Sequence, residues 1–236
     1  MNVNLYNNNS NINSNQNIYD SFNDFIMSAD RNVFNKLYMR TYLYDMVKHL
    51  NGDIVECGVF KGSGLFTWLK LIDLYQPNSI KKVIGFDFFG QEFVDTLVND
   101  IDRNTMKQVF TRDDKLITDD ISLEGITNKI ASAGFKQSKF DLIKGDITQT
   151  SVEYMKERPG FRISLLYLDM DLEKPTLDAL EAFWDRIVPG GIVVFDEYAY
   201  HSWSESNAVD KFISSKKNIS LISTNVHAPT AYFVKD

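Results

Sequence analysis

Five carboxylates stand at the ends of short apolar segments, and they are the residues best suited to do chemistry. Glu56 lies near the end of the first segment and Asp87 ends the second. Asp146 follows the third, Asp169 the fourth and Asp196 the fifth. If these segments are parallel strands, all five acids face one crevice, because ligands bind outside the carboxyl ends of such strands. Carboxylates crowded in this way repel one another unless cations or hydrogen-bond donors are present.

Each acid also has a structural interpretation, because an aspartate at the end of a strand often caps the helix or loop that follows. Caps at all five positions would explain the pattern less well than a shared ligand site. Both interpretations stay open for Asp146, which either contacts a ligand or caps a helix that begins near Thr150.

A glycine-rich turn after the first apolar segment narrows the choice of ligand. From Glu56 the chain reads E-C-G-V-F-K-G-S-G, and glycine permits close backbone approach and positive φ angles. The spacing G-x-x-x-G-x-G differs from the G-x-G-x-x-G of dinucleotide binding. An acid directly before the loop suits a cationic ammonium or sulfonium group better than a phosphate.

Together these features predict S-adenosylmethionine (SAM) as the cofactor. Glu56 would hold its amino-acid end, and Asp87 would accept hydrogen bonds from its ribose hydroxyls. Asp146 would meet the adenine amino group, unless it is only a cap. The loop residues expected to line the cofactor are Gly58, Gly62, Ser63 and Gly64.

The elements that must position these residues follow from an alternation of apolar and amphipathic segments. Strands are expected at residues 54–57, 83–87, 140–143, 163–168 and 192–195, with closing strands at 219–223 and 231–234. Helices are expected at residues 63–75, 123–133, 150–158, 175–188 and 206–214. This order predicts an α/β, Rossmann-like fold with a mostly parallel seven-stranded sheet and helices on both faces.

The alternation of strands and helices predicts one domain at residues 53–236. Two segments before this domain and one segment inside it do not follow the alternation. Residues 1–17 are rich in asparagine and predict a disordered tail, because they can bury little apolar surface. Residues 18–52 carry apolar side chains at helical spacing, which predicts two helices that could form a dimer surface or cover the active site. Residues 88–120 are too long for an ordinary connection and predict a lid insertion.

Composition sets limits on partners and location. The chain has 236 residues with 25 Lys and Arg against 32 Asp and Glu, and this net charge of −7 disfavours a nucleic-acid binder. The single cysteine, Cys57, excludes an intrachain disulfide framework and a cysteine-built zinc site. No apolar run approaches the roughly 20 residues of a membrane span. We therefore expect a cytoplasmic protein with a small-molecule partner and, as an open question, a homo-oligomer.

Three motifs in this order resemble the macrocin O-methyltransferase (TylF/MycF-like) family. They are D-I-V-E-C-G-V-F-K-G-S-G at 53–64, L-D-M-D-L-E-K-P-T at 168–176 and V-P-G-G-I-V-V-F-D-E-Y at 188–198. The resemblance implies a class I methyltransferase fold that uses SAM and a divalent ion, usually Mg²⁺. It also implies a hydroxyl acceptor on a sugar of a natural product.

The resemblance further implies a set of metal ligands. Asp169 matches the first acid of the family's D-x-D segment, while Asp196 and Glu197 match its paired acids after the fifth strand. These three would hold Mg²⁺, which prefers oxygen ligands and retains waters or substrate oxygens, so Asp169 would also take part in catalysis. Glu197 replaces the more usual aspartate, and its extra methylene can change the coordination.

The proton acceptor departs from the family pattern. The resemblance implies a histidine base in the lid, yet residues 88–140 contain none. Among His49, His201 and His227, we take His201 as the candidate because it follows the metal acids closely. The alternative is a loop histidine that bonds only to backbone or solvent.

The predicted function is therefore SAM-dependent, divalent-metal-dependent O-methylation of a sugar, a sugar-containing natural product or a nucleotide sugar. A bound ion would lower the pKa of the acceptor hydroxyl and orient it. One alternative is an NAD(P)-dependent oxidoreductase, against which the missing G-x-G-x-x-G counts. The other is a non-catalytic SAM-binding module, against which the intact acids at 169, 196 and 197 count.

Overall fold

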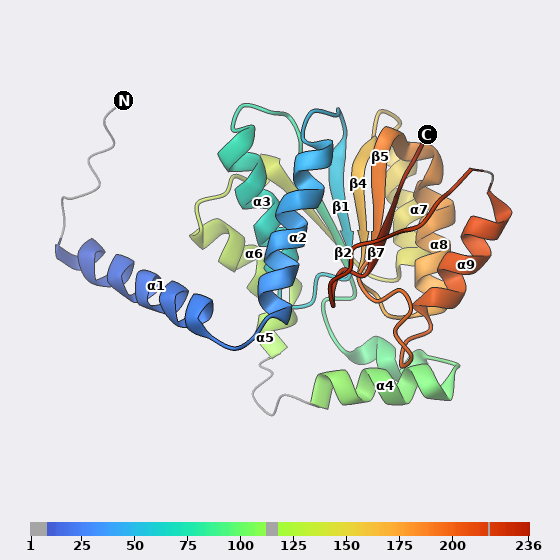
Figure 1. Cartoon of the computed structure of the whole chain (residues 1–236), viewed down its shortest axis with the longest axis horizontal. Helices are drawn as coiled ribbons and strands as arrows, with labels where there is room; N and C mark the ends of the chain where they lie inside the picture. The colour runs from blue at the N-terminus through green and yellow to red at the C-terminus, as the bar shows by residue number, and fades with distance from the viewer. Residues whose placement is uncertain (1–8, 112–117, 217) are drawn as a thin grey trace.

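The computed structural model describes residues 9–111, 118–216 and 218–236, which build a seven-stranded sheet between two layers of helices (Figure 1). The sheet order is β3-β2-β1-β4-β5-β7-β6, in which β1 to β5 run parallel and the last two strands run antiparallel. The strands are β1 (Asp53–Cys57), β2 (Val83–Asp87), β3 (Phe140–Lys144), β4 (Ile163–Leu168), β5 (Ile187–Phe195), β6 (Ile222–Ser223) and β7 (Ala231–Val234). The predicted seven-stranded, mostly parallel sheet is thereby confirmed, although β6 is shorter than the strand expected at 219–223.

The two faces of the sheet are covered by different sets of helices. One face carries α2 (Asn32–Val47), α3 (Ser63–Tyr75) and α6 (Leu123–Ser132). The other carries α7 (Ile147–Glu157), α8 (Glu173–Phe183) and α9 (Glu205–Ser215). Because β1 and β4 are neighbours, the strand order reverses between them, and open α/β sheets bind their ligands beyond the carboxyl ends of the strands at such a point.

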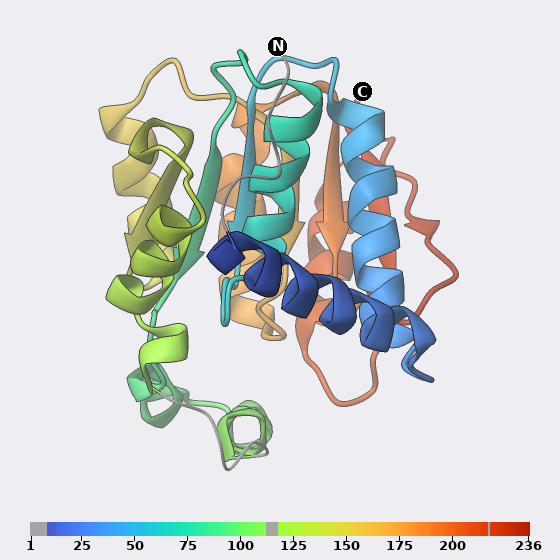
Figure 2. The same cartoon turned by 90° about the vertical axis from the view of Figure 1, so that its left-hand side faces the viewer.

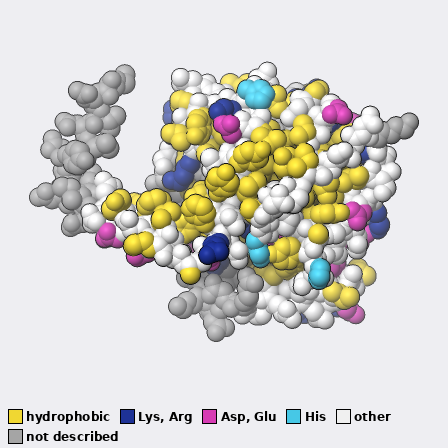
Figure 3. Space-filling view, in the orientation of Figure 1, with side chains coloured by type: hydrophobic (Ala, Val, Ile, Leu, Met, Phe, Trp, Pro, Cys, Tyr) yellow, Lys and Arg dark blue, Asp and Glu magenta, His cyan; other side chains and the backbone are white. Residues whose placement is uncertain are grey.

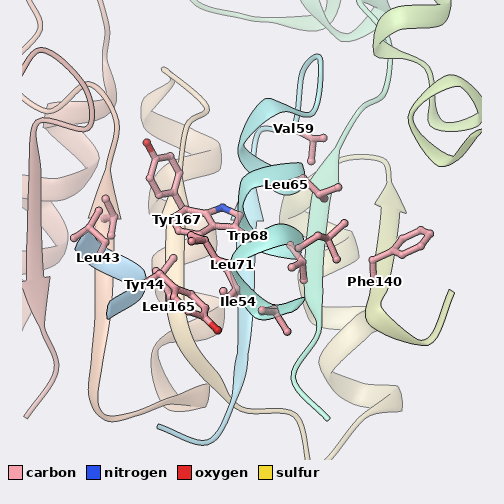
Figure 4. Close-up of a cluster of buried hydrophobic side chains, with 14 of the residues drawn as sticks. Leu43, Tyr44, Ile54, Val59, Leu65, Trp68, Leu71, Phe140, Leu165 and Tyr167 are labelled. Carbon is pink, nitrogen blue, oxygen red and sulfur yellow. The ribbon is translucent and has the colours of Figure 1, made fainter. Parts of the chain in front are cut away.

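Burial on both faces explains the continuous apolar character of the central strands. Every residue of β4 is buried. On the α2–α3 face, the rings of Trp68 and Tyr167 meet with centroids 5.7 Å apart, beside Leu43 and Leu65 (Figure 4). On the other face, Phe183 lies 5.4 Å from Phe86 between ring centroids. Aromatic side chains thus pack against both faces of the central strands.

The segment before the sheet contains more helix than the sequence predicts. Helix α1 (Asn9–Met27) begins within the predicted disordered tail, so the prediction is corrected for residues 9–17; residues 1–8 lie outside the described chain. Side chains support this helix locally, since Gln16 Nε2 donates to Asp20 Oδ1 at 2.7 Å and Asn23 Nδ2 donates to the Tyr19 carbonyl at 2.8 Å. Figure 2 shows α1 crossing in front of α2 and α3 as a separate rod.

Strand β5 begins five residues before the predicted start. The predicted helix at 175–188 ends at Phe183, and the short 3-10 helix η3 (Trp184–Arg186) leads into Ile187, which pairs with Ile163 of β4. Gly190 has φ +78°, and the pairing with β4 shifts in register nearby. The residues Pro189, Gly190 and Gly191 therefore form an irregularity inside the strand and not its boundary.

The predicted lid contains η1 (Glu92–Thr96), α4 (Asp100–Thr111) and α5 (Thr118–Ile121), with residues 112–117 outside the described chain. It lies beyond the edge at which the parallel strands end (Figure 1, Figure 2). Val94 and Met106 pack on Leu172, which joins the lid to the loop after β4. Within the described residues, no helix combines the length and the apolar character that crossing a membrane requires.

Candidate active site

The last hydrogen bonds of the sheet position the acids that follow β4 and β5. Asp169 donates its backbone N–H to the Cys57 carbonyl at 2.8 Å, and Asp196 donates its own to the Leu168 carbonyl at 3.0 Å. Because these strands are adjacent and parallel, both residues lie at the carboxyl edge of β1 and β4. The sheet thus fixes the backbone positions of Asp169 and Asp196, and the loops that follow determine the directions of their side chains.

Three carboxylates converge in this loop region, and they differ in one member from the predicted ligand set. Oxygen atoms of Asp169, Asp171 and Glu197 all lie within 4.8 Å of one another. Among the described residues, Glu197 Oε2 is buried without a hydrogen-bond partner. Burial and the neighbouring carboxylates raise the pKa values of all three side chains. Such a group of oxygens, with one buried and unsatisfied, fits a hard divalent cation.

Asp196, the third predicted ligand, is engaged elsewhere. Its side chain is fully buried and accepts hydrogen bonds from the Tyr167 hydroxyl and from Lys36 Nζ, the latter at 2.6 Å. Lys36 Nζ also lies 3.9 Å from Asp169 Oδ2. Burial opposes the charge on Lys36, but Asp169 and Asp196 outweigh that effect and raise the pKa of its ammonium.

Arg40, one turn further along α2, brings a second cation to the same acids. Its guanidinium Nη2 lies 3.7 Å from Glu56 Oε1 and 4.0 Å from Asp169 Oδ2, and its Cζ lies 5.0 Å from the centre of the Tyr167 ring. Arg40 is 4% exposed and Glu56 is 2% exposed. Burial raises the pKa of Glu56 to about 7, while Arg40 opposes that shift.

The glycine loop brings the backbone close to these acids. A Cβ added to Gly64 would lie 1.8 Å from Glu56 Oε1, and one added to Gly58 would lie 1.8 Å from the Asp169 carbonyl oxygen. Gly62 precedes α3 at φ +87°, and Ser63 is the exposed first residue of that helix. Glycine is therefore required where the loop crosses both Glu56 and the start of the loop after β4.

Asp87 holds the glycine loop in place. Its Oδ2 accepts from the backbone N–H of Val59 at 2.6 Å and of Phe60 at 3.0 Å. Its Oδ1 accepts from the N–H of Phe89 at 2.7 Å. Each carboxylate oxygen can accept more than one hydrogen bond, so this anchoring role leaves capacity for a ligand hydroxyl.

Asp146 acts as a cap in this structure. It is the N-cap of α7, and its side chain accepts from the Thr148 N–H at 2.9 Å. The helix consequently begins at Ile147, earlier than the sequence predicts. The cap interpretation of Asp146 therefore holds, and its contact with adenine stays a proposal.

The two histidines near the candidate site have different surroundings. His201 lies exposed on the turn between β5 and α9. His227, in the loop between β6 and β7, has its Nδ1 2.8 Å from the Tyr200 hydroxyl. Burial raises the pKa of Tyr200, and the charges of Glu197 and Asp196 raise it further, so this hydroxyl lies within the field of the acids.

Sequence reasoning missed several members of the site. Asp171 stands two residues after Asp169 in the same motif and was visible there. Lys36 and Arg40 are four residues apart on one helix face, and this spacing was a usable signal. Glu205 is fully buried and its Oε1 accepts from the Glu197 N–H at 3.2 Å, but no local pattern marks it.

The sequence matches the macrocin-O-methyltransferase (TylF) family over residues 17–235. The chain belongs to this family. That match confirms the resemblance stated from the three motifs and identifies the group of enzymes as O-methyltransferases. It favours methyl transfer over the oxidoreductase alternative, because it includes both the glycine loop and the acids after β4 and β5.

A curated relative from Streptomyces olivaceus is 25% identical over 148 residues, which are 63% of this chain. That relative is the 8-demethyl-8-(2,3-dimethoxy-alpha-L-rhamnosyl)-tetracenomycin-C 4'-O-methyltransferase. The match covers 53% of its length, about half of that protein. It therefore supports the family assignment and leaves the activity of the whole chain to a proposal.

Solved structures of methyltransferases share the fold. CalS11, a TDP-rhamnose 3'-O-methyltransferase of calicheamicin biosynthesis, superposes with a TM-score of 0.63 at 23% identity over 97% of this chain and 96% of its own. The O-methyltransferase NovP gives a TM-score of 0.69 at 19% identity over 85% of this chain and 79% of its own. These likenesses confirm the predicted class I methyltransferase fold.

Proposed function

We propose that this chain is a SAM-dependent O-methyltransferase that acts on a hydroxyl of a sugar. The sugar is part of a nucleotide sugar or is attached to a natural product. The family match over residues 17–235 carries this proposal. It is supported by the names of the relatives, since the Streptomyces olivaceus enzyme and CalS11 both methylate rhamnose hydroxyls. A cytoplasmic location and a homo-oligomer stay predictions from the sequence.

The cofactor site that we propose consists of Glu56, the glycine loop and Asp87. In the described chain, Glu56 Oε2 is a buried acceptor that lacks a hydrogen-bond partner, which fits a ligand ammonium. Asp87 orders the loop and retains lone pairs for ribose hydroxyls. Gly58 and Gly64 leave the room that a side chain would fill.

The metal ligands that we propose are Asp169, Asp171 and Glu197, with Asp196 beside them. Asp171 joins the set of Asp169, Asp196 and Glu197 expected from the resemblance, because it completes the convergent group. Asp196 accepts from Lys36 and Tyr167 and stays a proposed ligand. Six carboxylates gather here (Glu56, Asp169, Asp171, Asp196, Glu197 and Glu205), and Lys36 and Arg40 neutralise two charges at most. A divalent ion, when bound, would lower the pKa of an acceptor hydroxyl and orient it.

The chain must also accept the proton that the hydroxyl loses as its oxygen takes the methyl group. We propose His201 for this role, because it lies exposed on the loop that carries Glu197. His227 is the comparison, since it lies against Tyr200 in a separate loop. A modest general base suffices where the hydroxyl is already acidified.

Methyl transfer is tested with purified protein, SAM, Mg²⁺ and TDP-rhamnose, with S-adenosylhomocysteine and methylated sugar measured by mass spectrometry. We expect turnover that EDTA abolishes and that Asp171→Asn lowers at least a hundredfold. Asp95→Asn, which changes an exposed lid carboxylate paired with Lys107, is the matched control and keeps activity. Binding of NAD without binding of S-adenosylhomocysteine in calorimetry would overturn the proposal.

A non-catalytic module would give a different outcome. In that case S-adenosylhomocysteine binds, but neither TDP-rhamnose nor a panel of rhamnosylated natural products is methylated with any divalent ion. For the proton acceptor, we expect His201→Ala to lower turnover more than His227→Ala while both variants bind S-adenosylhomocysteine normally. The opposite order would transfer the role to His227.

A further inference from the structure

Helix α2 is apolar on two sides, and the sheet covers only one of them. Leu43 and Val47 belong to the buried side. Phe34, Tyr38 and Tyr42 follow one another at intervals of four residues and are 45%, 59% and 47% exposed. Residues four apart lie on the same face of a helix. Because a helix that is apolar on both sides is normally covered on both, this second face is a candidate contact surface.

Helix α1 adds a second exposed stripe. Ile18, Phe22 and Ile26 are also four residues apart and are 69%, 52% and 47% exposed. The end of α1 meets the start of α2, where the rings of Phe25 and Phe34 lie 6.4 Å apart between centroids. Figure 3 shows hydrophobic side chains gathered over both helices on one face of the molecule. We call the two exposed stripes together the α1–α2 patch.

The sequence of α1 does not explain why this segment is a stable helix. It is rich in asparagine, which is a weak helix former. Isolated helices gain little stability in water, and packing of an apolar face supplies most of it in proteins. Figure 2 shows α1 as a rod that stands apart from the sheet. Within the described residues its apolar stripe lies largely exposed, so we expect a second surface to cover it.

The size of the patch matches a dimer interface. A fully covered aromatic side chain buries about 150–250 Å², so the exposed fractions of Phe22, Phe34, Tyr38 and Tyr42 together offer about 300–500 Å². The isoleucines of α1 add to this area, and so do four flanking residues that are 43–75% exposed, Tyr19, Met27, Val33 and Leu37. A standard interface buries about 800 Å² on each partner. The largest apolar patch of a typical monomer covers only about 300–600 Å².

The charges of the two helices indicate how two copies meet. Helix α1 carries Asp20 and Asp24 and no basic residue. Helix α2 follows the exposed Arg31 and carries Lys36 in its first turns. Two α1 helices side by side would bring acids together, whereas α1 against α2 brings opposite charges together. A two-fold axis that places α1 of one copy on α2 of the other covers both stripes in both copies.

A pocket of about 290 Å³ opens beside the α2 stripe. Tyr38 and Tyr42 line it from α2, Tyr232 lines it from β7, and Ser223 and Asn225 contribute polar groups at the end of β6. Side chains that anchor protein interfaces are typically aromatic or apolar groups that fill such pockets. The pocket therefore offers room for an apolar side chain from the helix that packs on α2.

We propose that the α1–α2 patch is a dimer interface in which α1 of each copy packs on α2 of the other. This inference does not depend on the proposed function. The α2 helix continues from the patch to Arg40, whose Nη2 lies 3.7 Å from Glu56 Oε1. The second copy therefore also holds in place the helix that brings this cation to the candidate site.

Sedimentation velocity of the full chain over a range of protein concentrations tests the interface. We expect the wild type to sediment with twice the mass of one chain. Ile18→Asp on α1 and Tyr38→Asp on α2 should each weaken dimerisation at least hundredfold, because each change enters a two-fold interface twice. Ile80→Asp is the matched control, since Ile80 is 97% exposed in the turn between α3 and β2, and it should leave dimerisation unchanged.

The reactivity of an introduced thiol reports which surface the second copy covers. Cys57 is the only cysteine and is fully buried, so a new cysteine is read without background. Val33→Cys, at a position 55% exposed beside the patch, should react with iodoacetamide more slowly as the protein concentration rises. Val98→Cys, at a lid position 93% exposed, is the matched control and should react at the same rate at every concentration.

Circular dichroism checks that each variant is folded, and if Tyr38→Asp does not fold, Ile18→Asp on the separate α1 helix still tests the interface. A dimer that neither aspartate variant dissociates would overturn the proposal. A monomeric wild type would overturn it too: protection of Val33→Cys at every concentration would then indicate an intramolecular cover, and binding to phosphatidylcholine vesicles a membrane surface. Because no methyl transfer is measured, these failures leave the proposed function standing.

Discussion

Arg40 offers a stringent test of the electrostatics beneath the glycine loop. Arg40→Met removes a 4%-exposed guanidinium and leaves an apolar side chain of comparable length against Trp68 and Tyr167. Glu56, whose Oε1 lies 3.7 Å from Arg40, is 2% exposed and loses its nearest cation. The variant thus separates the loss of a charge from the creation of a cavity.

The expected loss of stability in Arg40→Met follows from the distance between the charges. Two opposite charges about 4 Å apart attract by about 4 kcal/mol at an effective dielectric constant near 20. Removal of one partner from a buried ion pair typically destabilises a protein by about 3–5 kcal/mol. We therefore expect Arg40→Met to lower the free energy of unfolding by about 3–5 kcal/mol at pH 8.5, where Glu56 is ionised.

The pH dependence follows from the pKa of Glu56, which burial raises to about 7 from 4.5. Below pH 7 the folded protein binds a proton at Glu56, and a neutral carboxyl needs no cation. At pH 5.5 the loss should shrink to about 1–2 kcal/mol, the value of the two cation–π contacts. Asp169 also lies near Arg40, so part of the effect at high pH comes from that side chain.

The assay is urea unfolding of the wild type, Arg40→Met, Glu56→Gln and the double variant at pH 5.5 and 8.5. We expect Glu56→Gln to restore most of the stability that Arg40→Met loses at pH 8.5, which gives a large coupling energy at that pH alone. Equal losses at both pH values, or additive single effects at pH 8.5, would refute the reasoning.

Two further perturbations follow from single contacts. Gly64→Ala places a Cβ 1.8 Å from Glu56 Oε1 and should destabilise the fold by about 1–3 kcal/mol and weaken S-adenosylhomocysteine binding; Gly160→Ala, where a Cβ meets no described atom within 4 Å, is the neutral control. Lys81 donates to Ser164 Oγ at 2.8 Å, and burial lowers its pKa from 10.5 to about 8, so its charge costs stability below pH 8 and that cost fades towards pH 10.5. Relative to Lys81→Met, the free energy of unfolding of the wild type should therefore rise by about 3 kcal/mol between pH 8 and pH 10.5, at about 1.4 kcal/mol per pH unit. Chemical denaturation at several pH values measures this, and a stability difference between the two proteins that does not change with pH would contradict the prediction.

Much of the sheet could be predicted from local pattern. Residues 83–87 and 163–168 are strands as expected, and residues 63–75 are the expected helix. These segments are continuous apolar runs or amphipathic stretches bounded by glycine or aspartate, and neighbouring residues suffice to specify them. The parallel order then requires that the acids after β4 and β5 share one edge.

The local pattern was misleading in two places. Residues 187 and 188 read as the end of a helix, yet Ile187 pairs with Ile163 on β4. Residues 9–17 read as a tail, yet they belong to a helix whose later turns carry the exposed apolar side chains of Phe22 and Ile26. Figure 3 shows hydrophobic side chains exposed along this part of the molecule.

By itself, the sequence determined the family, the fold and the edge of the sheet at which the acids gather, because these depend on motifs and on the alternation of elements. Only the tertiary structure decided which carboxylates converge and which are neutralised. Lys36 and Arg40 stand more than a hundred residues before Asp169 and Asp196, and they reach those acids because α2 packs on β4 and β5. The spacing of Lys36 and Arg40 places them on one face of a helix, but the acids that this face meets are set by how distant segments pack.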